Sequence, residues 1–172
     1  KYLRRAGPMT ALKGEAIGRF LKRPDKPVAL VYGPDAGLVT ERAAAIIESF
    51  LGAGADPMAR TVIDGDGLSG APERLAEEAH SVPMFGGRRA IRVTAGSRNI
   101  MPSVQPVLSD PPREAVVVIE AGDLKPSSPL RKAIEKSGSA VAIPCYVDDS
   151  RAIEGLIADE MAAAGLQVSP DA

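Results

Sequence analysis

The sequence predicts an α/β protein in three layers, with helices covering both faces of a mostly parallel β-sheet. Strand-like and helix-like segments alternate along the chain at the spacing that βαβ units require. The runs 28–32 and 115–119 are apolar at every position. Continuous apolar runs of this length are typical of strands buried on both faces, as the strands of a parallel sheet are.

Turn signals and apolar periodicity predict the remaining elements. The segment 38–50 has apolar residues at helical spacing, and Ser128 followed by Pro129 marks a helix start. Pro106 is expected to kink or end its helix, because proline lacks the N–H that an interior position donates. The predicted strands are 28–32, 59–63, 88–94, 115–119 and 140–145, and the predicted helices are 14–22, 38–50, 73–80, 100–108, 129–136 and 150–164.

The chain is expected to contain one α/β domain and the beginning of another. The α/β domain comprises residues 1–147 in this interpretation, and residues 148–172 begin a small helical domain. A second helix start signal, Ser169-Pro170-Asp171, lies close to the last residue. We therefore expect the natural protein to be longer than this chain.

The composition narrows the functional classes. The 172 residues are 45% hydrophobic and 25% charged with a net charge of −1, which is typical of a globular protein and argues against strong DNA binding by this chain alone. A single cysteine, Cys145, lies in an apolar run and is expected to be a buried structural thiol. His80 is the one histidine, and nothing in the sequence pairs it with Cys145 as a nucleophile. No signal peptide or membrane span is visible, so a cytoplasmic protein is expected.

The turn after the first strand resembles a nucleotide-binding loop that has lost its chemistry. A glycine turn between a buried strand and a helix is where P-loop proteins hold phosphate, with the pattern Gly-x-x-x-x-Gly-Lys-Ser/Thr. Here Gly33 and Thr40 occupy the outer positions and Gly37 lies between them. Leu38 and Val39 stand where the second glycine and the lysine are needed. Nothing in this loop would neutralise a nucleotide's phosphates.

The acidic half of such a site is also incomplete. A P-loop ATPase holds Mg²⁺ with acids at the end of a second strand. Glu120 follows the run 115–119, but Ala121 stands where the second acid is needed. Asp64 and Asp66 offer two further carboxylates, although their spacing is also that of an ordinary polar turn. The sequence therefore predicts no catalytic residue, no metal site and no bound cofactor.

Two surface features remain open between a binding role and a structural one. The strongest basic cluster is Arg88, Arg89, Arg92 and Arg98. Strand alternation places Arg89 on the opposite face from Arg88 and Arg92, so the cluster is more typical of a solvated strand end than of a phosphate or acidic-protein site. The second feature is the apolar character of the connection 81–87.

That connection carries bulky side chains between a proline and a glycine pair. Its residues are Ser81, Val82, Pro83, Met84 and Phe85, followed by two glycines. Either Met84 and Phe85 pack into the core, or they form an exposed anchor that enters a partner's pocket. The pattern alone favours the core, because most apolar loop residues are buried or scattered singly.

Three sequence blocks together resemble the delta subunits of bacterial DNA polymerase III clamp loaders. The blocks occur in the family's order and the resemblance covers nearly the whole chain after Met9. They are VYGPDAGLVTER at 31–42, SVPMFGGRRAIRV at 81–93 and VVVIEAGDLKPSSPLRKAIE at 116–135.

The resemblance implies a fold and an assembly. The first domain would be of the AAA+ type but would not hydrolyse ATP, the second would be a small helical domain, and a third, the helical collar, lies outside this chain. Delta subunits bind the ring-shaped sliding clamp and wedge one interface open, so that an ATP-driven complex can place the ring on primed DNA. The resemblance therefore implies a non-catalytic subunit of the DNA-directed DNA polymerase holoenzyme. Its partners would be the sliding clamp and the other loader subunits, with weak or no DNA binding by this part and no membrane contact.

The resemblance also implies a contact site. In the family, a Leu-Phe pair on this connection enters a pocket on the clamp, and by position that pair is Met84-Phe85 here. Val82 would join the contact, and the flanking residues are Ser81, Pro83, Arg88 and Arg89. The usual family pattern begins with Gln and has Leu before Phe, whereas this chain has Ser81 and Met84. Two alternatives stay open: an active P-loop nucleotidase with a divergent loop, and a purely structural assembly domain.

Overall fold

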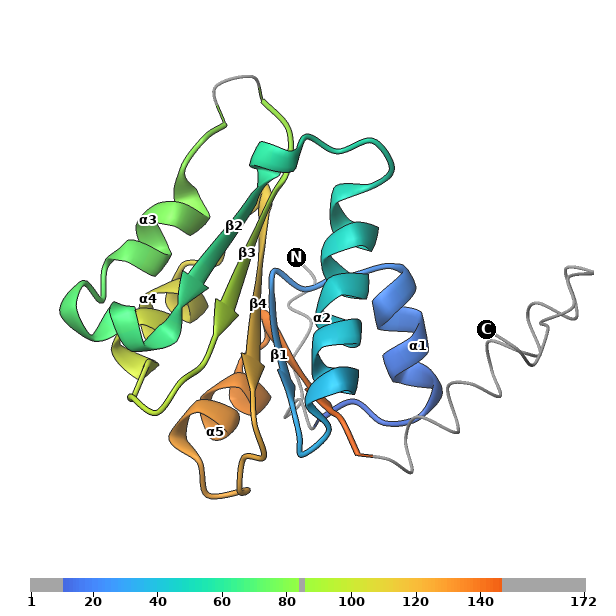
Figure 1. Ribbon diagram of the computed structural model, residues 1–172, viewed down its shortest axis with the longest axis vertical. Coiled ribbons are helices and arrows are strands. Elements are labelled where there is room, and N and C mark those ends of the chain that lie inside the picture. The colour runs from blue at the N-terminus through green and yellow to red at the C-terminus, as the bar shows by residue number, and fades with distance from the viewer. Residues whose placement is uncertain (1–10, 84–85, 147–172) are drawn as a thin grey trace, which may run out of the picture.

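The computed structural model describes residues 11–83 and 86–146, which form a parallel sheet between two layers of helices (Figure 1). The described strands follow the order β2-β3-β4-β1-β5, and every neighbouring pair is parallel. The predicted three-layer α/β class is therefore correct. The strands are β1 (Val28–Tyr32), β2 (Arg60–Asp64), β3 (Arg89–Thr94), β4 (Ala115–Ala121) and β5 (Ala140–Pro144).

The two apolar runs occupy the middle of this sheet. β1 pairs with β4 on one side and with β5 on the other, and every residue of all three strands is buried. β2 lies at the edge, where the side chain of Val62 is 68% exposed. The burial pattern explains why these three strands are apolar at every position except Glu120 of β4, whereas β2 is not.

The helices divide between the two faces. α1 (Glu15–Lys22) and α2 (Ala36–Leu51) cover one face, and α3 (Arg74–His80), α4 (Met101–Ser109) and α5 (Pro129–Lys136) cover the other (Figure 1). Two short 3₁₀ segments flank β2, at Pro57–Ala59 and Gly65–Gly70. The result is two aliphatic cores separated by the sheet. The first contains Ile17, Val39 and Ile46, and the second contains Leu75, Val104 and Ile134.

Cys145 and His80 lie at opposite ends of the parallel strands. Cys145 is fully buried directly after β5, as expected of a structural thiol. His80 ends α3 and is near the beginning of the strands, beside Asp110. Because the described strands are all parallel, their N-terminal ends lie on one side of the sheet and their C-terminal ends on the other. His80 and Cys145 are therefore far apart and do not form a nucleophilic pair.

The sequence predicted that Pro106 would kink or end its helix, and the structure shows that the helix does not end there. α4 continues to Ser109, and the Asp110 N–H donates to the carbonyl of Pro106 at 2.9 Å. A proline so close to the end of a short helix removes one intrahelical bond, and packing of Val104 and Val107 in the core outweighs that loss. Ser128 occupies the expected N-cap position of α5, although its side chain makes no capping hydrogen bond.

The predicted second domain, 148–172, lies outside the described residues. Among residues 11–83 and 86–146, none of the helices combines the length and the apolar character that crossing a membrane requires. Within the same ranges, no group of three or more His, Cys, Asp and Glu side chains is arranged to hold a metal ion.

Candidate functional site

The connection between β1 and α2 is shorter than the predicted nucleotide loop. α2 begins at Ala36, so Gly37 lies in its first turn and only residues 33–35 join the strand to the helix. The helix predicted over 38–50 therefore begins two residues earlier than the sequence indicated. The cause is Asp35, whose side chain accepts the Leu38 N–H at 2.9 Å and caps the helix.

This cap changes the electrostatics of the position where a P-loop holds phosphate. A helix N-terminus attracts anions through its unpaired N–H groups and the helix dipole. Here the Asp35 carboxylate already occupies that place and adds negative charge. The backbone of Gly33 packs against the end of β5, where an added Cβ would lie 2.2 Å from the Cys145 carbonyl oxygen. The residues of this turn therefore do not fit the phosphates of a nucleoside triphosphate.

Glu120, the acid at the end of β4, is bound to an arginine. Its carboxylate is almost fully buried and accepts a hydrogen bond from Arg92 Nη2 at 3.0 Å. The Arg92 Nε lies next to the other oxygen of the same carboxylate. Arg92 reaches it from the adjacent strand β3. This arrangement pairs the carboxylate with a guanidinium in the position where Mg²⁺ would bind in a P-loop ATPase.

The other predicted acids stabilise a turn. Asp64 accepts the Asp66 N–H at 3.1 Å, and Asp66 accepts the backbone N–H of Arg98 at 2.9 Å. These are the hydrogen bonds of a polar turn, which the sequence indicated as the simpler interpretation.

The arginines of the basic cluster point in different directions. Arg92 pairs with Glu120 on the α2 side of the sheet, and Arg89 pairs with Glu78 on the α3 side. Arg88 lies over the ring of Phe50, with its guanidinium carbon 5.2 Å from the ring centroid. The alternation predicted for β3 is thus correct, and these three side chains do not combine into one basic patch.

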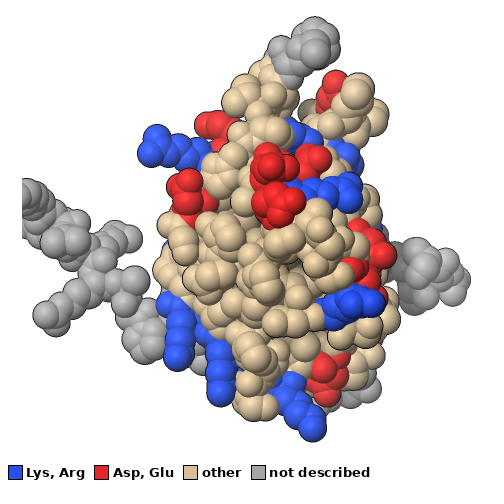
Figure 2. All heavy atoms as spheres, turned by 90° about the vertical axis from the view of Figure 1, so that its left-hand side faces the viewer, with Lys and Arg blue, Asp and Glu red and all other residues tan. Residues whose placement is uncertain are grey.

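The face formed by α3 and α4 is also without a basic patch. α4 contains no charged residue. Figure 2 shows this face with an uncharged central area and with acidic and basic residues around its margin. A surface of this kind lacks the concentrated positive charge that phosphate-backbone binding requires.

The connection between α3 and β3 is the second candidate site. Met84 and Phe85 lie outside the described residues, but both flanks are described. Val82 is 86% exposed, so this apolar residue projects away from the core. The Gly86 N–H donates to the Pro83 carbonyl at 3.0 Å and joins the two flanks.

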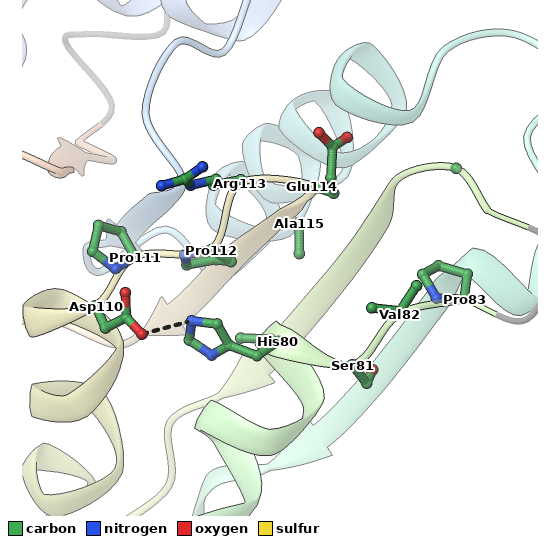
Figure 3. Close-up of a pocket in the computed structure, with 12 residues that line it drawn as sticks. His80, Ser81, Val82, Pro83, Asp110, Pro111, Pro112, Arg113, Glu114 and Ala115 are labelled. Carbon is green, nitrogen blue, oxygen red and sulfur yellow. Dashed lines mark ion pairs between the residues drawn. The ribbon is translucent and has the colours of Figure 1, made fainter.

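A groove of about 400 Å³ lies beside these flanks. Val82 and Pro83 line one side, and the segment from Asp110 to Ala115 lines the other (Figure 3). His80 faces Asp110 across it, with Nε2 3.5 Å from the carboxylate oxygen. Sequence reasoning did not find this groove, because it depends on how the end of α3 packs beside the end of α4.

Comparison with solved structures indicates which proteins share this architecture. The DNA clamp loader delta protein YqeN of Bacillus subtilis superposes with a TM-score of 0.57 over 75% of this chain, at 20% identity. A DNA polymerase III gamma subunit-related protein from Thermotoga maritima superposes with a TM-score of 0.53 over 84% of this chain, at 15% identity. The chain has the fold of clamp-loader proteins. No protein-family model matches the sequence, and no curated protein matches it.

The matched part is a fraction of each clamp-loader structure. This chain spans 41% of the Bacillus protein and 49% of the Thermotoga protein. Within this fold, the two candidate sites lie at opposite ends of the parallel strands. The nucleotide-type turn follows β1, and the connection with Val82 precedes β3.

Tyr32, the last residue of β1, is expected to make the free energy of unfolding decrease at alkaline pH. Burial raises the pKa of Tyr32 from 10.0 to about 12, and the Arg131 guanidinium, 5.0 Å from the ring centroid, partly offsets this effect. As the pH rises, the phenol of the unfolded chain ionises before that of the folded protein. The contribution of Tyr32 to the free energy of unfolding is therefore fully present below pH 10 and is lost as the pH rises towards 12. We expect a loss of about 2 kcal/mol in that interval.

Urea unfolding at pH values on either side of that interval checks this expectation. Tyr32→Phe has no phenol to ionise, so its free energy of unfolding should fall less than that of the wild type over the same interval. Tyr146→Phe serves as the control, because Tyr146 is partly exposed and bonds Asp123 through its hydroxyl. Equal alkaline losses in the wild type and Tyr32→Phe would contradict the assignment.

Proposed function

We propose that this chain is part of a delta-type clamp-loader subunit, which binds the sliding clamp and opens its ring for loading onto primed DNA. The observation that carries the proposal is the exposed side chain of Val82 in the connection between α3 and β3, on a domain with the clamp-loader fold. Val82 is exposed there instead of packing into the core. The anchor itself is assigned to Met84 and Phe85, and Ser81 and Pro83 flank it.

The two anchor side chains alone would bind the clamp weakly, so further contacts are required. Burying a Met and a Phe side chain contributes about 1.5–3 kcal/mol each. Association loses translational and rotational freedom, which consumes a large part of that gain. Val82 and the groove beside it offer the additional area. Opening of the ring requires that this surface bind the open clamp more tightly than the closed one, since a ligand shifts an equilibrium only through such a difference.

The proposal assigns no ATP hydrolysis to this chain. Asp35 at the α2 N-terminus and the pairing of Glu120 with Arg92 support this, because both remove chemistry that a P-loop ATPase uses. The ATP-driven step and the polymerase activity belong to other subunits of the holoenzyme. Contacts with those subunits and with primed DNA are assigned to the complete assembly in the cytoplasm.

The first test is binding to the sliding clamp of the same organism. We expect Met84→Ala/Phe85→Ala to weaken the equilibrium affinity about 100-fold, because two buried anchors are lost. Thermal unfolding of this variant should match the wild type. Met58→Ala is a matched control, since Met58 is 85% exposed at a different place on the molecule.

Three results would count against the proposal. Equal binding of wild type and double variant would place the contact elsewhere. A loss of stability of about 2–5 kcal/mol in the double variant would mean that the pair belongs to the core and that this domain has a structural role. ATP binding that requires Mg²⁺ and Glu120 would favour the divergent nucleotidase.

A further inference from the structure

An ion pair closes the base of the connection that carries the proposed anchor. Arg89 Nη2 donates to Glu78 Oε2 at 2.9 Å. Glu78 belongs to the last turn of α3, before the connection, and Arg89 is the first residue of β3, after it. The pair therefore joins the two ends of the segment 79–88 directly.

Several further contacts fix the same two ends. Arg89 Nη2 also donates to Thr61 Oγ1 of β2 at 2.9 Å, and the Arg89 N–H donates to the Glu114 carbonyl at 2.9 Å. On the α3 side, the Ser81 hydroxyl donates to the Glu78 carbonyl at 3.0 Å. The side chains of Arg89 and Glu78 are 16% and 30% exposed, so water screens this pair less than a surface pair.

Arg88 fixes the β3 end from the other face of the sheet. Its Nη1 donates to the Phe50 carbonyl at 3.0 Å, and its guanidinium lies over the Phe50 ring. The family resemblance implied that Arg88 and Arg89 flank the partner contact. In the structure both side chains bond to other parts of the same chain, at the point where the connection enters the strand.

We propose that Glu78 and Arg89 are positioning residues for the sliding clamp, which hold the flanks of the anchor in the conformation that the clamp accepts. This inference rests on the proposed function. Neither side chain needs to touch the clamp. Their ion pair sets the separation and direction of the two flanks, so the binding-competent arrangement is largely formed before the partner arrives.

A positioning role has a kinetic signature that a direct contact lacks. When the competent conformation is only partly populated, the apparent affinity falls in proportion to that population. The association rate falls by the same factor, whereas the dissociation rate of the formed complex does not change. Removing a direct contact at an interface acts mainly on the dissociation rate.

The experiment measures association and dissociation rates of the chain with purified sliding clamp by surface plasmon resonance. Glu78→Gln keeps the shape of the side chain and removes its charge. We expect an association rate about fivefold lower than that of the wild type, with an unchanged dissociation rate. Arg89→Lys keeps the charge opposite Glu78 and should lose less.

Glu135→Gln is the matched control. Glu135 pairs with Arg131 at 2.8 Å, the two side chains are 24% and 18% exposed, and the pair lies on α5. It therefore tests the loss of a similar ion pair remote from the connection. We expect this variant to bind the clamp at wild-type rates.

The outcomes separate the inference from the function on which it rests. If the wild type binds through Met84 and Phe85 but Glu78→Gln and Glu135→Gln associate alike, the positioning role is wrong and the proposed function stands. A faster dissociation of Glu78→Gln at an unchanged association rate would make Glu78 a contact residue and would also overturn it. If the wild type does not bind the clamp, the proposed function fails and the inference fails with it.

Discussion

Gly33→Ala is expected to lower the free energy of unfolding by about 4 kcal/mol, one of the two largest effects in this protein. Gly33 has φ of 154°, and a Cβ at this position would lie 2.2 Å from the Cys145 carbonyl oxygen and 2.8 Å from its carbon. Both atoms belong to the backbone, so no side chain can rotate away to relieve the overlap.

The backbone at Cys145 is held from two directions. The Cys145 N–H donates to the Tyr32 carbonyl at 2.7 Å. Next to it, Arg42 Nη1 donates to the Pro144 carbonyl at 2.5 Å. Moving the end of β5 to admit a methyl group would therefore disturb its hydrogen bonding to β1 and to α2.

Urea unfolding followed by circular dichroism measures this effect. Gly67→Ala is the appropriate control, because a Cβ at Gly67 would meet nothing within 4 Å. That variant should unfold close to the wild type. If Gly33→Ala unfolds at the same urea concentration as Gly67→Ala, the close approach of the two backbones is not a constraint on this turn.

Glu120→Gln is expected to lower the free energy of unfolding by about 3 kcal/mol. Glu120 is 6% exposed and Arg92 reaches it from the neighbouring strand. The amide would leave the half-buried Arg92 guanidinium without its carboxylate partner, and removing one partner of such a pair is far more costly than removing both. Arg92→Met/Glu120→Leu should therefore be more stable than Glu120→Gln alone.

The same variants distinguish a structural acid from a metal-binding one. Unfolding is measured with and without Mg²⁺ for the wild type, Glu120→Gln and the double variant. We expect Mg²⁺ to leave the wild type unchanged, because the carboxylate is already paired. A Glu120→Gln protein as stable as the wild type, or a wild type stabilised by Mg²⁺ through Glu120, would show that the pairing with Arg92 is not the role of this residue.

The sequence predicted those parts of the fold that depend on local patterns. The central strands were recognisable because each position is apolar, and α5 because Pro129 and the spacing of Leu130 and Ile134 indicate its start and its buried face. The start of α2 was misplaced although Asp35 is a common capping residue and offered a usable signal.

The features that the sequence did not reveal depend on register and packing. The Arg92–Glu120 pair requires the alignment of β3 with β4, in which Arg92 lies opposite Val118. The Glu78–Arg89 pair requires the placement of α3 against β3. Neither alignment leaves a trace in composition or periodicity, since each joins side chains from separate elements. The assignment of Met84 and Phe85 to the partner contact stays a prediction.

The strand order has a consequence for how the protein is made. Among the described strands, β1 is synthesised before the others, yet its neighbours in the sheet are β4 and β5, which are synthesised after the rest. Val28 finds its partners at Val117 and Ala140. Until those residues have been synthesised, the most apolar early segment of the nascent chain has no strand to pair with. The pairing of β1 must therefore wait for β4 and β5, and until then we expect its apolar surface to be open to aggregation.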